Sequence, residues 1–392
     1  MNTERKLKIL YITTMYPTPA YPQNGIFCHE QVKALKKLDI DVTVAVPTPF
    51  YGRTKEKEWD YEGVHITYVR FFKLPHALDF HRTGRALFRS LETAFDLTQF
   101  DIYHADAPLP SGYAAMVASQ KYQIPFIVHG HGLDAFLEGS YKDAANCKKI
   151  VDACIKVYQE ADAIAGVSQK VLNEIAKKVA LRDKAYVVYN GVDTERFHPV
   201  EREKADTLQI ASIGNLIPLK GHDYTIRAIR LLVDEGITDI KLTIAGRGVL
   251  EAELKALTHE LNLEEYVEFV GYIPYDDIVR LLQKSDLFVL PSWYEALGCV
   301  YLEAMACGVP AIGCYGNGID EVIRDGVNGY LVEGKSEQQI YEKIKAFIKS
   351  ANQSEMRENA RLSVENRYTW LCSAEMLKQL YGDVINDTIE DE

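Results

Sequence analysis

The sequence predicts an α/β protein of two doubly wound, mainly parallel sheets in tandem, each with helices on both faces. The 392-residue chain exceeds the roughly 250–300 residues at which a single hydrophobic core stops growing. Short β-branched or apolar runs alternate with amphipathic helical stretches along the chain, which is typical of parallel sheets. Its composition, 47% hydrophobic and 26% charged, is that of an ordinary globular protein.

Each sheet is predicted from its own series of short apolar runs. The strands expected in the first sheet are residues 8–13, 41–46, 65–69, 102–104, 126–129, 163–166 and 185–189. Those expected in the second are residues 208–213, 241–245, 266–270, 287–290, 311–313 and 329–331. The helices predicted between them include residues 30–37, 112–120, 169–179, 223–234, 250–261, 275–284 and 299–307.

The segment N-G-V-D-T-E-R-F-H-P-V-E-R-E-K, residues 190–204, marks the expected domain boundary. Asn-Gly is a turn signal, Pro199 interrupts regular structure, and a charged run follows. We therefore expect an N-terminal domain of residues 1–198 and a second domain of residues 199–366. Residues 367–392 contain a helical apolar stripe and are expected to form a C-terminal helix that crosses back to the N-terminal domain.

Charge and cysteine content exclude several classes of protein. The formal charge is −12, with +2 in residues 1–200 and −14 in residues 201–392, which argues against a nucleic-acid-binding protein. The seven cysteines include no C-x-x-C pair, so neither a disulfide framework nor a zinc ribbon is indicated. No apolar run approaches 18 residues and the first residues do not resemble a signal peptide, so a cytoplasmic location is expected.

The stretch E-A-L-G-C-V-Y-L-E-A-M-A-C-G-V-P, residues 295–310, carries two glutamates at the carboxyl end of a predicted strand. Glu295 lies on the loop, Gly298 permits a turn, and Glu303 falls inside the following helix. The amino end of such a helix favours a diphosphate, and an adjacent carboxylate accepts hydrogen bonds from sugar hydroxyls. Two glutamates on a solvated helix face are the competing interpretation.

Two further loops of the second half follow predicted strands. G-N-L-I-P-L-K-G-H places Lys220 between Gly214 and Gly221, and a lysine there supplies a point charge for phosphate. A-G-R-G places Gly246 and Arg247 where a nucleotide could approach the backbone closely. Neither loop has the phosphate-loop or dinucleotide spacing, so an ordinary turn is an equal alternative for each.

In the first half, Gly25 follows a Pro-rich loop after the first strand, and V-H-G-H-G-L-D follows a later strand. His129 and His131 are two residues apart on an extended segment and would share a face, so a metal-binding pair is one interpretation. A buried structural histidine is the alternative for either ring. The only D-x-D, Asp39–Asp41, precedes a strand and fits a turn better than a metal site.

Together these motifs resemble the retaining glycosyltransferases of family 4, which have the GT-B fold of two Rossmann-like domains facing a central cleft. The resemblance runs in order over nearly the whole chain. It includes Y-P-x-x-x-x-x-G-I-F, I-P-F-I-V-H-G-H-G-L-D, A-D-A-I-A-G-V-S, V-Y-N-G-V-D-T-E-R-F-H-P, the K-G loop, A-G-R-G and P-S-W-Y-E-A-L-G-C-V-Y-L-E-A-M-A-C-G-V-P. The E-x7-E element and N-G-V-D-x-x-x-F are its most specific parts.

The resemblance implies a role for each candidate residue. Glu295 and His131 would lie near the donor sugar, Glu303 would bind the ribose of the nucleotide, and Lys220 would neutralise the diphosphate. The donor-binding positions it implies are Gly25, Asn215, Lys220, Gly246, Arg247, Leu297, Gly298, Cys299, Val300 and Glu303. Asn215 stands where many relatives have arginine, and Ala296 replaces a common glycine.

The implied activity is transfer of a sugar, with retention, from a nucleoside diphosphate donor such as a UDP-sugar to an acceptor hydroxyl. The nucleotide-sugar is a co-substrate, and neither a cofactor nor a metal is expected, because Lys220 and helix N–H groups would stabilise the leaving diphosphate. A nucleotide-sugar epimerase of the same fold, a non-catalytic nucleotide-sugar-binding protein and a zinc hydrolase built on His129 and His131 are the alternatives.

The acceptor, a glycan or a lipid-linked sugar in cell-surface polysaccharide synthesis, is expected to meet the N-terminal domain. Residues 70–89 carry five basic residues and one acidic residue among aromatics, which suits contact with the inner face of a membrane. A solvated helix with a core-facing apolar stripe fits the same segment equally well.

Overall fold

The computed structural model describes residues 5–52, 56–73, 80–132, 144–181, 183–201 and 206–390. The chain divides into two compact units, unit 1 formed by Met1–Asn190 with Trp370–Glu392 and unit 2 formed by Gly191–Thr369. The first division falls earlier in the chain than the expected 198/199. The reason is that Val192 and Phe197 are buried in unit 2, where the Val192 N–H donates to the Tyr368 carbonyl oxygen over 2.9 Å.

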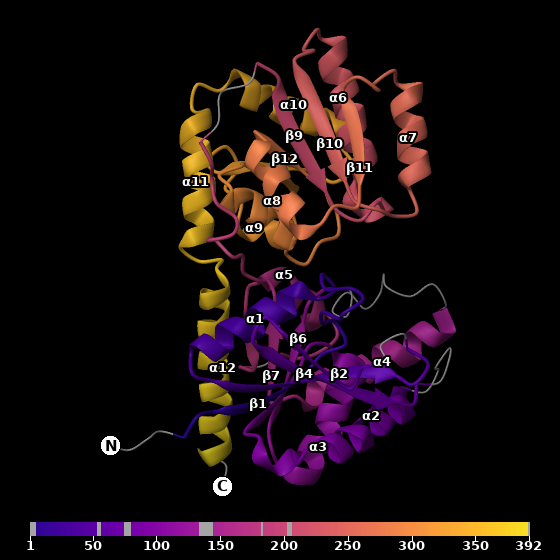
Figure 1. Cartoon of the computed structure of the whole chain (residues 1–392), viewed down its shortest axis with the longest axis vertical. Helices are drawn as coiled ribbons and strands as arrows, with labels where there is room; N and C mark the ends of the chain where they lie inside the picture. The colour runs from indigo at the N-terminus through magenta and orange to yellow at the C-terminus, as the bar shows by residue number, and fades with distance from the viewer. Residues whose placement is uncertain are drawn as a thin grey trace. The chain divides into compact units, whose positions relative to one another are not determined.

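The sheet of unit 1 is parallel except at one edge (Figure 1). In spatial order its described strands are β3 (Glu58–Tyr61), β4 (Val64–Phe71), β2 (Asp41–Pro49), β1 (Lys8–Ile12), β5 (Ile102–Ala105), β6 (Phe126–Gly130), β7 (Ala163–Gly166) and β8 (Ala185–Val187). Its helices include α1 (Ile26–Lys37), α2 (Phe80–Ala94), α3 (Tyr113–Tyr122), α4 (Ala144–Glu160), α5 (Gln169–Ala176) and α12 (Trp370–Glu390).

The sheet of unit 2 is parallel throughout its described pairs. Its order is β11 (Val267–Gly271), β10 (Ile240–Ala245), β9 (Leu208–Ile213), β12 (Leu287–Val289), β13 (Ala311–Cys314) and β14 (Gly329–Val332). The helices are α6 (His222–Asp234), α7 (Glu251–Glu260), α8 (Tyr275–Lys284), α9 (Cys299–Ala306), α10 (Glu337–Lys349) and α11 (Gln353–Glu365), with the short turns η3 (Pro218–Lys220) and η4 (Gly318–Glu321).

The predicted fold class of two doubly wound sheets is confirmed, and every predicted strand is present within a few residues of its expected bounds. The sequence did not indicate β3, a short edge strand that pairs antiparallel with β4. In each sheet the strand order reverses beside a central strand, at β1/β5 in unit 1 and β9/β12 in unit 2. Ligands of doubly wound folds bind beyond the carboxyl ends of the strands at such points.

The C-terminal helix α12 belongs to the core of unit 1. Figure 1 shows it, in yellow, beside α1 and β1. Its buried apolar side chains pack in one cluster with Ile9 and Tyr11 of β1. The α12 residues of this cluster are Trp370, Ala374, Leu377, Leu380, Tyr381 and Val384. Polar contacts reinforce this packing, since Gln31 Nε2 of α1 donates to Ser373 Oγ over 3.1 Å. No described helix has the length and apolarity needed to cross a membrane.

The basic segment 70–89 is described at residues 70–73 and 80–89, while 74–79 lie outside the described residues. Within α2 the buried side chains Thr83, Leu87, Phe88 and Leu91 form a core-facing stripe. The interpretation as a helix with an apolar core stripe therefore accounts for the aromatic and aliphatic residues of α2. Its arginines, Arg82, Arg85 and Arg89, are exposed.

Candidate functional site

In unit 2, two of the candidate residues meet at the amino end of α9. Lys220 ends the turn η3 after β9, and its Nζ forms an ion pair with Oε2 of Glu295, which lies on the loop after β12. Both side chains are largely shielded from solvent, with 18% and 14% exposed. The Lys220–Glu295 pair joins the loops that follow β9 and β12, the neighbouring strands at which the strand order reverses. The predicted site was expected at this position.

A local hydrogen-bond network fixes the Glu295 loop. The Glu295 N–H donates to Asn317 Oδ1 over 3.0 Å, and the Asn317 amide nitrogen donates to the Ser292 carbonyl oxygen over 3.1 Å. The hydroxyl of Tyr301, on α9, donates to the carbonyl oxygen of Leu290. Asn317 and Tyr301 therefore hold the backbone on either side of Glu295, and neither was singled out by the sequence analysis.

Gly298 sets the start of α9. It has φ 82°, and a Cβ atom there would lie 2.7 Å from the Tyr301 ring and 3.2 Å from Glu295 Cγ. A side chain is excluded sterically as well as conformationally. The segment 297–300 therefore keeps the amino end of α9 beside Glu295, where the helix supplies a partial positive charge.

Glu303 lies further along α9 in a more buried setting. Its side chain accepts a hydrogen bond from the Tyr275 hydroxyl over 3.0 Å, and 8% of the residue is exposed. Burial raises the pKa of Glu303 to about 7, against the opposing effects of that hydrogen bond and of Arg196. The guanidinium of Arg196 lies over the Tyr275 ring, 5.1 Å from its centroid. The buried carboxyl argues against two glutamates on a solvated face.

The loops after β9 and β10, which the sequence analysis also assigned to the binding site of the donor nucleotide-sugar, contact each other through their backbones. The Leu216 N–H donates to the Arg247 carbonyl oxygen over 2.9 Å, and a Cβ on Gly246 would lie 1.9 Å from the Gly214 oxygen. Asn215 and Arg247 are exposed, and the Arg247 guanidinium lies 5.5 Å from the centroid of the Tyr272 ring. The loops after β9 and β10 thus form one backbone surface with two polar side chains available to solvent.

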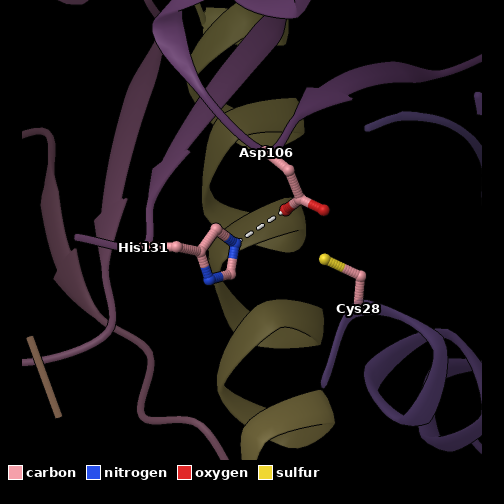
Figure 2. Close-up of side chains that lie close together, drawn as sticks. All are labelled: Cys28, Asp106 and His131. Carbon is pink, nitrogen blue, oxygen red and sulfur yellow. Dashed lines mark hydrogen bonds and ion pairs between the residues drawn. The ribbon is translucent and has the colours of Figure 1, made fainter. Parts of the chain in front are cut away.

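In unit 1, Gly25 and His131 follow β1 and β6. Gly25 precedes α1 with φ 62°, and a Cβ there would lie 2.2 Å from the Met15 backbone, so the glycine seats the loop closely. His131 Nε2 lies 2.9 Å from Oδ1 of Asp106, the residue that follows β5 (Figure 2). Asp106 was missed by the sequence analysis, because H-A-D after a strand carries no distinctive spacing.

The metal interpretation of His129 and His131 acquires donors from other parts of the chain. Donor atoms of Cys28, Asp106 and His131 lie within 4.8 Å of one another, as do those of His104, Asp106 and His129. In the first set, His131 Nε2 already lies at hydrogen-bond distance from Asp106 Oδ1, 2.9 Å away. Burial raises the pKa of the Cys28 thiol well above its usual range, so in the metal-free protein Cys28 is a protonated thiol. His129 is fully buried, as its structural interpretation expected.

Comparisons with known proteins agree with this arrangement. The family model described as Glycosyltransferase Family 4 matches residues 25–196, and the model described as Glycosyl transferases group 1 matches residues 193–363. A teichuronic acid biosynthesis glycosyltransferase by name, TuaC of Bacillus subtilis (strain 168), is 29% identical over 369 residues, covering 87% of this chain and 89% of that protein.

Solved structures share the fold. Sucrose-phosphate synthase from Thermosynechococcus elongatus superposes with a TM-score of 0.80 at 18% identity, covering 97% of this chain and 100% of the other. HepE of Anabaena, solved with UDP and glucose, gives a TM-score of 0.75 at 20% identity, covering 96% of this chain and 100% of the other.

Proposed function

We propose a specific reaction for this chain, which belongs to the glycosyltransferases and has the GT-B fold. The Family 4 model matches its first part, residues 25–196, and the group 1 model matches the following part, residues 193–363. It transfers a sugar from a nucleoside diphosphate donor, a UDP-sugar, to a hydroxyl of a glycan or lipid-linked acceptor, with retention of the anomeric configuration. The observation that carries the proposal is the meeting of Lys220 and Glu295 at the amino end of α9. The UDP complex of HepE supports the choice of nucleotide.

The leaving diphosphate is the group that needs most stabilisation in such a transfer. Lys220 supplies a positive charge and α9 supplies the partial charge of its amino end, both on the rigid ends of neighbouring strands. Fixed charges of this kind favour the developing dianion without a reorganisation step. We therefore propose that the reaction needs neither a metal nor another cofactor, with the departing phosphate accepting the proton of the acceptor hydroxyl.

Donor binding changes the partners of both residues of the pair. When a diphosphate occupies the amino end of α9, it competes with the Glu295 carboxylate for Lys220. Glu295 is then released to accept hydrogen bonds from sugar hydroxyls, while Glu303, further along α9, accepts them from the ribose. His131 of unit 1 contacts the donor sugar in this proposal, as the family resemblance implies.

The acceptor binds unit 1, which also carries a surface suited to an anionic membrane. Three exposed aromatic residues directly follow the paired strands β2 and β4. They are Phe50 (60% exposed), Tyr51 (61%) and Phe72 (60%). The exposed arginines of α2 provide charge for anionic headgroups. We propose that the enzyme works in the cytoplasm at the inner face of the membrane, on a lipid-linked acceptor for cell-surface polysaccharide.

The first test is thermal stabilisation of the purified protein, with chelator present, by UDP, GDP, ADP and their sugars. A ligand that binds only the folded state raises the melting temperature. We expect UDP and a UDP-sugar to do so, and Lys220→Ala to weaken UDP binding by about tenfold to a hundredfold. Lys255→Ala is the matched control, because Lys255 is an exposed lysine of α7 paired with Glu251.

Product analysis then separates the candidate activities. NMR of the product of a UDP-sugar that stabilises the protein should show a glycoside with the anomeric configuration of the donor. An epimerised nucleotide-sugar would identify the epimerase, and donor left intact in the presence of acceptor lipids would identify a non-catalytic binding protein. Either result would overturn the proposed transfer.

A further inference from the structure

A buried carboxylate surrounded by imidazole rings lies beyond the carboxyl end of β5 in unit 1. Asp106 is 1% exposed, and its Oδ1 lies 2.9 Å from His131 Nε2, 3.4 Å from His104 Nε2 and 4.0 Å from His129 Nδ1. His131 is the outermost of the three rings, with 5% of its side chain exposed against 0% for the other two. The cluster therefore has one slightly exposed ring, His131, whose Nε2 points toward the buried Asp106 carboxylate (Figure 2).

The rings behind His131 are held neutral. Burial lowers the pKa of His104, against the effect of Asp106, and burial together with the neighbouring imidazoles of His131 and His104 lowers the pKa of His129 well below its usual range. Burial acts to raise the pKa of Asp106, but His131 and His104 outweigh it and lower that pKa well below the ordinary value. Asp106 is therefore an ionised acceptor, and a buried ionised acceptor needs N–H donors.

The C-terminal helix completes the network from the other side. The Tyr381 hydroxyl of α12 lies 2.6 Å from His104 Nδ1, and both groups are fully buried. Because the ionised Asp106 can only accept, the neutral His104 ring carries its proton on Nε2, the nitrogen that faces Asp106, and its Nδ1 accepts from the Tyr381 hydroxyl. Tyr381 thereby supports this tautomer, in which His104 presents a donor to the same carboxylate oxygen as His131.

The other groups facing this carboxylate do not supply a competing charge. Tyr11 of β1 packs on the His104 ring at 4.4 Å between centroids, and its hydroxyl donates to Gln31 Oε1 over 2.9 Å. Cys28 of α1 is fully buried and lies 3.8 Å from Thr13 Oγ1. The Phe27 ring packs against His131 at 5.1 Å between centroids. The His131 ring thus sits between an aromatic neighbour and a fixed anion.

We propose that Asp106 is a positioning residue that fixes the orientation and tautomer of His131, and that Tyr381 supports it through His104. This inference rests on the proposed function, in which His131 contacts the donor sugar. With its Nε2 proton directed to Asp106, the His131 ring is held in one orientation and one tautomer, with Nδ1 on the side of the ring away from Asp106 (Figure 2). The C-terminal helix is then a contributor to the active site.

The variants are Asp106→Asn, which keeps the shape but removes the charge and the unambiguous acceptor, and Tyr381→Phe. We expect Asp106→Asn to lower kcat by about tenfold to a hundredfold, the scale of a misplaced contact, and to leave UDP binding unchanged, because UDP is bound by unit 2. Tyr381→Phe should lower kcat several-fold. The matched control is Tyr103→Phe, since Tyr103 is also a buried tyrosine of unit 1 but donates to the Leu97 carbonyl oxygen.

Two further measurements separate positioning from general damage. In a double-mutant cycle, Asp106→Asn should add little to the loss caused by His131→Ala, because the aspartate acts through that ring. In ¹⁵N NMR of the histidine side chains, wild type should show the His131 proton on Nε2, and Asp106→Asn should alter that pattern. Full additivity in the cycle, wild-type kcat in Asp106→Asn, or an unchanged His131 pattern would each overturn the inference.

The NMR experiment needs no turnover, so it tests the Asp106–His131 arrangement even if no UDP-sugar is transferred. Failure of the proposed function would appear as absence of product with the NMR pattern as expected. Failure of this inference would appear as an unchanged NMR pattern or kcat in Asp106→Asn with the wild-type enzyme active. Adding chelator or Zn²⁺ should change neither readout, and a metal-dependent His131 spectrum would replace positioning by metal binding.

Discussion

Glu303→Gln tests the most quantitative statement about the donor site, the raised pKa of a buried carboxyl. The pKa of Glu303 is raised from an ordinary 4.5 to about 7 by burial. The folded protein therefore binds this proton more tightly than the unfolded chain does. The contribution of the protonated carboxyl to stability is fully present below about pH 4.5 and is lost as pH rises through about 7. At about 1.4 kcal/mol per pKa unit, the loss is about 3 kcal/mol.

Glutamine keeps the shape and stays neutral at every pH, so Glu303→Gln should not suffer this loss. All other groups titrate in both proteins and cancel in the comparison. For a unit of this size, each kcal/mol changes the melting temperature by about 2–4 °C. The melting temperature of Glu303→Gln relative to wild type, measured without nucleotide, should therefore rise by about 6–12 °C between pH 4.5 and pH 8.

The matched control is Glu358→Gln, which removes an exposed carboxylate from α11 and should give the same difference from wild type at both pH values. A Glu303→Gln difference that also stays constant would refute the reasoning, because it would mean that the carboxyl ionises as readily in the folded protein as in the unfolded chain. In that case either water would hydrate the Glu303 carboxylate, or its attraction to Arg196 would lower the pKa as much as burial raises it.

The same substitution should have the opposite effect on donor binding. Ribose hydroxyls donate to an ionised carboxylate more strongly than to a protonated one. With a pKa of about 7, the ionised fraction of Glu303 rises about tenfold between pH 6 and pH 8. The UDP affinity of wild type should therefore gain up to about tenfold over this range relative to Glu303→Gln, measured by calorimetry. Equal pH dependence in the two proteins would place the ribose elsewhere.

Three further substitutions test the donor site and its support. Glu295→Gln removes the present partner of Lys220, so UDP should bind about threefold to tenfold more tightly while transfer falls about a hundredfold; weaker UDP binding would contradict the competition between carboxylate and diphosphate. Gly298→Ala should cost about 1–3 kcal/mol, whereas Gly382→Ala, at a helical position with open space, should not destabilise; equal melting temperatures would contradict the strain. Arg361→Leu should destabilise unit 2 by about 2–4 kcal/mol in urea unfolding, because Arg361 donates to the carbonyl oxygens of Thr194, Phe197 and Ala306. A loss below about 0.5 kcal/mol, as at an ordinary surface site, would contradict this role.

The sequence predicts the sheets well because buried parallel strands are short apolar runs. The antiparallel strand β3 was missed for the converse reason: its four residues, E-W-D-Y, include two acids and none of them is buried, and only pairing with β4 makes them a strand. The start of α1 was expected at residue 30 and lies at Ile26, because Gly25 adopts the left-handed conformation that begins the helix directly after the loop. Single-residue dihedral angles of this kind are not visible in a hydrophobic pattern.

The candidate site was predictable as a set of loops and not as a set of partners. Lys220, Glu295 and Glu303 were found because they follow strands that end at one edge of a sheet. The pairing of Lys220 with Glu295 joins residues 75 positions apart, and Tyr275 reaches Glu303 from a different helix. No periodicity encodes such contacts. The role of the C-terminal helix was equally hidden, because Tyr381 meets His104 across 277 positions.

Among the buried carboxyl groups of the described residues, Asp106 and Glu303 differ in the groups that face them. Asp106 faces three imidazoles, and its pKa lies well below the ordinary value. Glu303 faces one hydroxyl and a more distant guanidinium, and its pKa is about 7. Oδ1 of Asp106 is paired with His131 Nε2 without any ligand, so this oxygen already holds another side chain in place. Glu303 accepts a hydrogen bond from the Tyr275 hydroxyl, and in the proposed function the two ribose hydroxyls of a nucleotide would add further donors. Donors that bind Glu303 would therefore offset part of the free-energy cost of ionising a buried carboxyl, whereas the imidazoles of His131 and His104 already offset part of that cost at Asp106.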